Sequence, residues 1–134
     1  MSEEKRHILV VDDDVQLVDS VTTLLESVGY SVSYAYHPEK ALDLAKETRP
    51  DLILLDIMFA GPPGPDGVEV SRQIHRDPEI QDIPVIMLSG VKKVLDMPVH
   101  LAHDEDYMPV KAFLEKPFEP EQLLAEVEKV LGSL

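Results

Sequence analysis

The chain has 134 residues, of which 26 are acidic and 12 basic, and its net charge of -14 opposes binding to nucleic acid or to an anionic membrane surface. No apolar stretch approaches the roughly 20 residues that cross a bilayer. The chain contains no cysteine, which excludes disulfides and thiolate chemistry and fits a reducing compartment. We therefore expect a cytoplasmic protein with a single domain over residues 1–134.

The first half of the chain alternates apolar strands with helices. Its patterns predict a strand over 7–11, a helix with apolar residues from 17 to 28, a strand over 30–35, a short helix from 38 to 48 and a buried strand over 52–55 that runs into Asp56. Asp13 or Asp14 can cap the first helix, and Gly29 can end it. Pro38 suits the first position of the second helix.

The second half repeats the alternation. It predicts a stiff loop over 57–65, a helix capped by Asp66 that ends at Asp77-Pro78, a strand over 83–88, one or two helical turns over 91–96, a strand over 111–115 and a last helix that begins at Pro120. Five strand–helix units indicate the α/β class. We expect a flavodoxin-like (βα)5 doubly wound parallel sheet with strand order 2-1-3-4-5.

Polar residues follow four of the predicted strands. Asp12 to Asp14 come after the first, Asp56 ends the third, Ser89 follows the fourth and Lys116 the fifth. In the expected order these four strands are neighbours, so their carboxyl ends share one pocket. Close carboxylates stay ionised when a cation joins them, and oxygen ligands suit Mg²⁺. A metal, a lysine and a hydroxyl can bind a phosphoryl group, with Asp56 as the nucleophile.

Each of these residues also has an ordinary structural explanation. Asp14 alone is better explained as a helix cap, Asp56 and Ser89 can be turn residues, and a lone Lys116 is usually a solvated charge. His100 and His103 have weak metal-ligand spacing and are better explained as part of a solvated loop. Four coincidences at four adjacent strand ends are improbable, and this conjunction favours a functional site.

Over nearly its whole length the chain resembles the receiver domain of two-component response regulators. The matching motifs are the opening strand with its acidic pair in Ile8 to Asp14, the phospho-accepting Asp56, Asp66-Gly67, the hydroxyl position Ser89, the aromatic switch position Phe113, and Lys116-Pro117-Phe118. The loop from 56 to 66 and the interval from 89 to 116 are longer than in the family pattern. The resemblance therefore implies an intact phosphorylation site. It does not indicate which surface would bind a downstream protein.

The resemblance also implies roles for these residues. Asp13, Asp56 and the backbone carbonyl of Met58 would bind Mg²⁺, Asp12 would help through water, and the Lys116-Pro117 peptide bond would be cis. A histidine kinase or phosphotransfer protein would phosphorylate Asp56. Ser89 and Lys116 would then bind the phosphoryl group, Phe113 would move, and a face that binds a downstream protein would change. We expect a stand-alone receiver that is not an enzyme beyond promoting its own phosphorylation and dephosphorylation.

Two alternatives belong to other classes of protein. One is a phosphatase of the haloacid dehalogenase type with Asp12 as the nucleophile, because Asp12-Asp13-Asp14 satisfies an Asp-x-Asp motif after a strand. Gln16 stands where that motif favours threonine, and Asp56 would have no task. The other is a receiver-like interaction module that is never phosphorylated.

Overall fold

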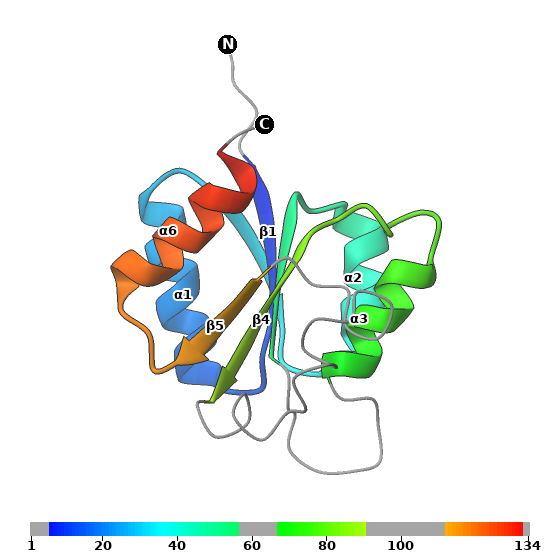
Figure 1. Cartoon of the computed structure of the whole chain (residues 1–134), viewed down its shortest axis with the longest axis horizontal. Coiled ribbons are helices and arrows are strands. Elements are labelled where there is room, and N and C mark those ends of the chain that lie inside the picture. Colours follow the sequence, from blue (N-terminus) through cyan, green and yellow to red (C-terminus); the bar gives the residue numbers. More distant parts are fainter. Residues whose placement is uncertain (1–5, 57–66, 91–111, 133–134) are drawn as a thin grey trace.

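Five parallel strands form the centre of the molecule (Figure 1). The computed structural model describes residues 6–56, 67–90 and 112–132. The strands lie in the order β2-β1-β3-β4-β5 and comprise β1 (His7–Val11), β2 (Ser31–Ala35), β3 (Leu52–Asp56), β4 (Val85–Gly90) and β5 (Ala112–Lys116). The predicted parallel sheet and its strand order are confirmed.

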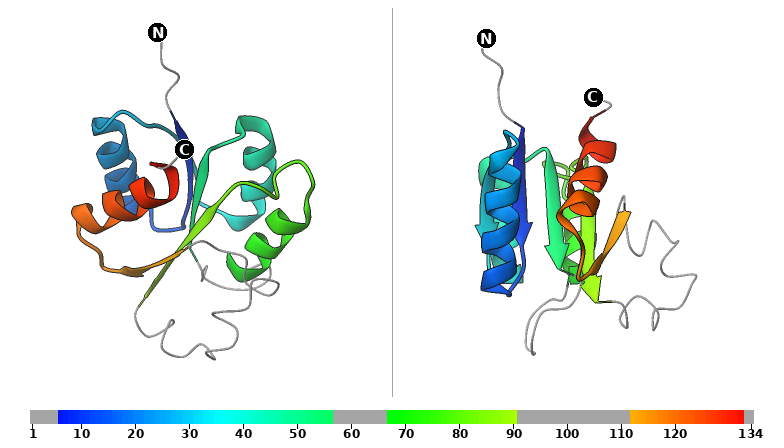
Figure 2. Two further views of the ribbon diagram at one scale, coloured as in Figure 1. Left: turned by 45° about the horizontal axis from the view of Figure 1, so that its top comes forward. Right: turned by 90° about the vertical axis from the view of Figure 1, so that its left-hand side faces the viewer.

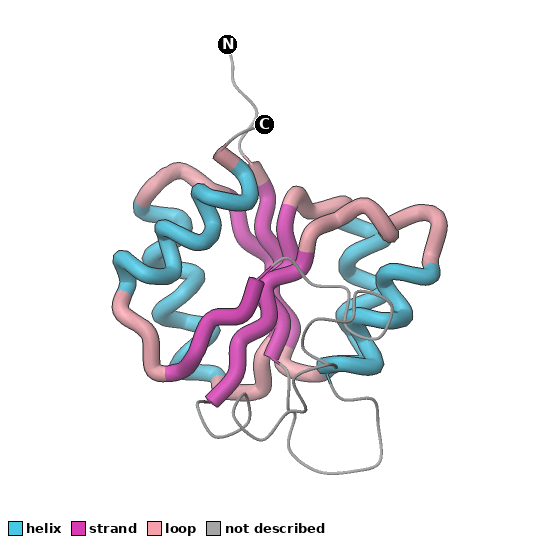
Figure 3. Tube along the Cα trace, viewed as in Figure 1, coloured by secondary structure: helices cyan, strands magenta, loops and turns pink. Residues whose placement is uncertain are grey.

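Helices cover both faces of this sheet (Figures 1 and 3). The helices α1 (Val15–Ser27) and α6 (Pro120–Leu131) pack on one face, and α2 (Ala41–Thr48) and α3 (Gly67–Arg76) on the other, as the rotated views of Figure 2 also show. Successive strand residues point to opposite faces, so each strand supplies both layers. Leu9 and Ile53 belong to the α2–α3 core, whereas Ile8 and Leu54 belong to the α1–α6 core.

Local residues set the helix ends. The side chain of Asp14 caps α1 by accepting a hydrogen bond of 3.1 Å from the N–H of Leu17. Gly29 follows the end of α1 with a φ of 105°, a positive value that glycine adopts more readily than other residues. A short 3-10 helix, η1 (Pro38–Lys40), precedes α2, which ends at Thr48 and is followed by Arg49 in the left-handed conformation, with a φ of 49°. The expected positions of Asp14 and Gly29 are confirmed.

The strand bounds differ from the predicted ones by one or two residues at several strand ends. Tyr30 stays outside β2 because its N–H donates to the carbonyl of Leu25 at the end of α1. Pro84 precedes β4 because proline has no N–H for the ladder, although its carbonyl accepts a hydrogen bond from Ile53. At the other end β4 and β5 continue to pair through Gly90 and Lys116. The predicted loop over 57–65, the cap Asp66 and the helix over 91–96 lie outside the described residues.

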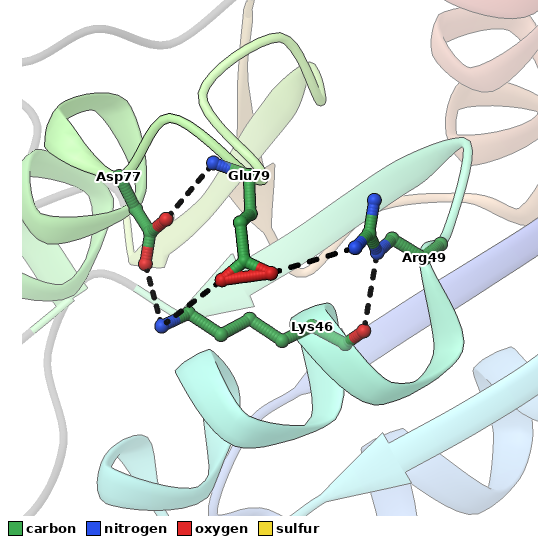
Figure 4. Close-up of polar contacts among 4 residues, drawn as sticks. All are labelled: Lys46, Arg49, Asp77 and Glu79. Atoms are coloured by element: carbon green, nitrogen blue, oxygen red, sulfur yellow. Dashed lines mark hydrogen bonds and ion pairs between the residues drawn. The ribbon is translucent and has the colours of Figure 1, made fainter.

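A group of four charged residues joins the carboxyl end of α2 to the segment after α3 (Figure 4). Lys46 Nζ lies 2.8 Å from Asp77 Oδ2 and 3.9 Å from a Glu79 oxygen, and Arg49 lies 3.5 Å from Glu79. The hydrogen bond from Lys46 lowers the pKa of the Asp77 carboxyl, and the same bond raises the pKa of Lys46. The pair therefore stabilises the folded state only while both groups are charged.

We expect Lys46→Gln to lower the melting temperature at neutral pH, and the difference from wild type to shrink in acid. The Asp77 pKa is depressed by folding, so this stabilisation is present above the unfolded value of about 3.9 and is lost as the pH falls through the lower folded value. Melting curves between neutral pH and strong acid measure the effect. Lys40→Gln is the matched control, because Lys40 forms no ion pair within the described ranges. A pH-independent difference would contradict the prediction.

Candidate functional site

The carboxyl edge of the sheet gathers the polar residues that follow the apolar strands. Asp12 directly follows β1, Asp56 is the last residue of β3 and Lys116 the last residue of β5. The backbone N–H of Asp12 bonds to the carbonyl of Ala35, so this residue still belongs to the ladder between β1 and β2. Asp12 and Asp56 are therefore held in place by the sheet itself.

Lys116 lies between two buried carboxylates. Its Nζ is 2.8 Å from Asp12 Oδ2 and 3.4 Å from Asp56 Oδ1. Asp12 is fully buried and Asp56 is 3% exposed, whereas the Lys116 side chain keeps 26% of its surface. Burial lowers the pKa of Lys116, but the hydrogen bonds and charges of Asp12 and Asp56 outweigh it, so the pKa is raised overall. The ammonium form is therefore the one present at neutral pH.

Asp14 takes part in the site through its backbone. Its N–H donates a hydrogen bond of 2.9 Å to Asp12 Oδ1. Sequence reasoning assigned Asp14 only to the helix cap. Its spacing of two residues from Asp12 is the signal that could have revealed this bond, because aspartate side chains often accept from the N–H two residues later. Both oxygens of Asp12 are thus engaged, one by Asp14 and one by Lys116.

Three carboxylates form a group that could hold a metal ion. Asp12, Asp13 and Asp56 each offer an oxygen, and these atoms all lie within 4.8 Å of one another. Asp13 is the exposed member of the group, so the carboxylates meet solvent on its side. Oxygen ligands of this kind suit a hard divalent cation such as Mg²⁺.

For two of the remaining expected site residues the structure describes only the position in a strand, and for the others it describes nothing. Ser89 lies in β4 opposite Glu115, and Phe113 lies in β5 opposite Met87. Their side chains, and the whole of Met58, His100 and His103, lie outside what the structure describes. The Lys116-Pro117 peptide bond is cis, as the resemblance implies. None of the helices in the described ranges is both long and apolar enough to span a bilayer.

Sequence comparison identifies relatives along nearly the whole chain. The family model of the response regulator receiver domain matches residues 8–128. The chain is 37% identical over 124 residues to the DNA-binding dual master transcriptional regulator RpaA of Synechocystis sp., covering 92% of this chain and 48% of that protein. It is 33% identical over 127 residues to the DNA-binding response regulator MtrA of Mycobacterium tuberculosis, covering 95% and 51%. The chain thus spans about half the length of these curated relatives.

Solved structures agree with this assignment. A putative response regulator from Chloroflexus aurantiacus superposes with a TM-score of 0.81 at 28% identity, covering 96% of this chain and 99% of that one. The chemotaxis response regulator CheY4 of Vibrio cholerae gives a TM-score of 0.80 at 26% identity, covering 96% and 100%. With the matched family model and the carboxylate–lysine site at the expected strand ends, the chain belongs to the response regulator receiver domain family.

Proposed function

We propose that Asp56 accepts a phosphoryl group from a histidine kinase or phosphotransfer protein. The observation that supports this most directly is the position of its buried carboxylate, 3.4 Å from the Lys116 ammonium and beside two further carboxylates. Lys116 can bind an oxygen of the incoming phosphoryl group, and the acidic group can hold the cation that such transfers need. The membership of the receiver family supports the same assignment.

The transfer is an in-line displacement at phosphorus. A carboxylate oxygen of Asp56 forms the new bond to phosphorus while the bond from phosphorus to the donor histidine nitrogen breaks, and that nitrogen keeps the electron pair. Asp13, Asp56 and the Met58 carbonyl, with Asp12 acting through water, would hold Mg²⁺. When bound, this ion would neutralise charge on the phosphoryl oxygens. Lys116 stabilises the same charge from the chain's own side.

The signal would pass through a change of conformation. In this proposal Ser89 and Lys116 bind the acyl phosphate, and Phe113 follows the movement of Ser89, which changes a face that binds a downstream protein. RpaA and MtrA are named as DNA-binding, but each is about twice as long as this chain. For this chain, with its net charge of -14, we propose a protein partner rather than nucleic acid, and a cytoplasmic location in keeping with the absence of cysteine.

The surroundings of Asp12 do not favour a role as nucleophile. It is fully buried, and both of its oxygens accept hydrogen bonds, from Asp14 and from Lys116. This arrangement disfavours the phosphatase alternative, in which Asp12 would attack the substrate. We propose instead that the chain takes up one phosphoryl group and does not turn over small phosphate esters.

The test is the intact mass of the chain after incubation with acetyl phosphate and Mg²⁺. We expect the addition of one phosphoryl group, and its absence when EDTA removes the divalent cation. Release of free phosphate over many turnovers from a small phosphate ester would support the phosphatase, and an unchanged mass with acetyl phosphate and Mg²⁺ present would support the module that is never phosphorylated.

We expect Mg²⁺ to raise the melting temperature of the wild-type chain, and Asp13→Asn to remove most of this increase. The variant loses a charged ligand from the three-carboxylate group. Without Mg²⁺ it should melt no lower than wild type, because one like charge has been removed from the group. Thermal melts with and without Mg²⁺ measure both effects.

Asp14→Asn is the matched control for this prediction. Asparagine caps helices as well as aspartate does, and the backbone N–H of residue 14 remains available to Asp12. The control should keep the full Mg²⁺ response. An equal loss in both variants would show that general negative charge, rather than the Asp13 carboxylate, sets the response.

A further inference from the structure

The outer edge of β2 has an unusual composition for this chain. The strand stands at one end of the sheet order, and residues 27–38 around it form the longest stretch of the sequence without Asp, Glu, Lys or Arg. The other terminal strand, β5, contains Glu115 and Lys116. Edge strands commonly carry charges that prevent pairing with another chain. The sequence from Tyr30 to Tyr36 has no such charge, no proline and no glycine, and is rich in β-forming residues.

The direction of the backbone groups in β2 follows from its pairing with β1. The N–H of Ser31 bonds to Arg6 and the carbonyl of Ala35 accepts from Asp12, so odd-numbered residues face β1. Backbone groups alternate along a strand, so those of Val32 and Tyr34 point outward. No strand within the described ranges pairs with them. This edge therefore offers donors and acceptors in the pattern that another strand requires.

The edge strand also carries an exposed large apolar side chain, that of Tyr34. Among the described residues, Val15, Val28 and Tyr34 are the large hydrophobic side chains that are most exposed, at 55%, 52% and 49%. Val15 and Val28 lie at the two ends of α1, which packs against β2. The Tyr34 ring lies 5.4 Å from the ring of Tyr36. The half-exposed Tyr34 ring can bury apolar area against a partner that pairs with this strand.

We propose that the β2 edge pairs antiparallel with the β2 edge of a second copy of this chain, about a two-fold axis. Two chains that each carry a charge of -14 repel over most of their surfaces, and the stretch without charges is where they can approach at the lowest electrostatic cost. The pairing that uses every outward-facing residue from Tyr30 to Tyr36 places Val32 opposite the partner's Tyr34 and puts Ser33 on the axis.

The proposed dimer leaves both acceptor sites open. Antiparallel pairing directs the carboxyl ends of the two sheets in opposite directions, so Asp56 of each copy remains accessible to a phosphodonor. The pairing is thus independent of the phosphorylation proposed above, and its test does not depend on that function. A strand pair with few flanking contacts buries a small area, so we expect a weak and reversible dimer.

Disulfide formation tests the register. The chain has no cysteine, so a Ser33→Cys variant forms a disulfide only between copies. In the proposed register the two introduced side chains face each other across the axis at a bridgeable distance. Ser31→Cys is the matched control: both serines lie on β2 and both bond to the ring of His7, at 2.7 and 2.8 Å. In the same register residue 31 lies opposite the partner's residue 35. The two residues at position 31 are therefore about 13 Å apart along the strands, too far for a disulfide.

We expect mild oxidation to link Ser33→Cys into a dimer and to leave Ser31→Cys mostly monomeric. Equal linkage of the two variants, or linkage of neither, would overturn the proposal. Light scattering of the wild-type chain over about a hundredfold range of concentration, in salt that screens the repulsion, should show reversible growth of a species with twice the mass. Tyr34→Lys should abolish it, because a charge enters the pairing edge, whereas Tyr34→Thr should keep it. A wild-type chain that stays monomeric, or one that forms fibrils, would also overturn the proposal.

Discussion

Asp56→Asn should take up no phosphoryl group from acetyl phosphate in the presence of Mg²⁺. The asparagine side chain has nearly the same shape and can still accept a hydrogen bond from Lys116, but its amide oxygen is not a nucleophile. Within the described residues, Asp12 is too fully engaged to replace it, because both of its oxygens are bonded. We therefore expect complete loss of the mass increase rather than a slower reaction, as measured on the intact chain.

Two features keep this result interpretable. Asp56→Asn removes one carboxylate from a group of three, and the Lys116 ammonium keeps its ion pair with Asp12, so the melting temperature should not fall much below that of wild type. Asp51→Asn makes the same chemical change at the residue directly before the start of β3. This control should retain the full mass increase. Labelling of Asp56→Asn at the wild-type rate would mean that another residue is the acceptor.

Lys116→Met should lower the stability of the chain and slow its phosphorylation. Within the described residues, the Lys116 ammonium forms ion pairs with both Asp12, which is fully buried, and Asp56. Removing one partner of a buried ion pair leaves the other charge unpaired. Because the Lys116 side chain is 26% exposed, we expect a loss of about 2–3 kcal/mol, below that for a completely buried pair. The missing charge should also weaken binding of the phosphoryl oxygens in the transition state.

Urea unfolding measures the loss of stability, and the rate of mass increase measures the loss of phosphorylation. Mg²⁺ should stabilise Lys116→Met more than wild type, because the ion can replace the ammonium among the three carboxylates. Lys116→Arg keeps the charge, so it should recover most of the stability. A Lys116→Met chain as stable as wild type without Mg²⁺ would show that the two ion pairs contribute little.

Much of the fold and the membership of the candidate site could be predicted from the sequence. Short apolar runs such as 8–11 and 52–55 can be distinguished from helices, whose apolar residues recur three or four positions apart. Parallel strands that are joined by helices can adopt only a few topologies. Because the carboxyl ends of parallel strands lie on one edge, the same pattern brings Asp12, Asp56 and Lys116 together. The roles of all the site residues remain predictions, and for Ser89, Phe113 and Met58 so do the side-chain positions.

The sequence by itself determined the class of fold, the order of its strands and the residues at its carboxyl edge, because periodicity and chain connectivity are written along the chain. Only the tertiary structure decided which atoms meet there: that Lys116 bonds both Asp12 and Asp56, that the N–H of Asp14 occupies the other oxygen of Asp12, and that Lys46 reaches Asp77. It also decided which backbone groups of β2 face outward. These features depend on strand register and on distances of a few ångströms between residues far apart in the chain, which a pattern along the chain does not contain.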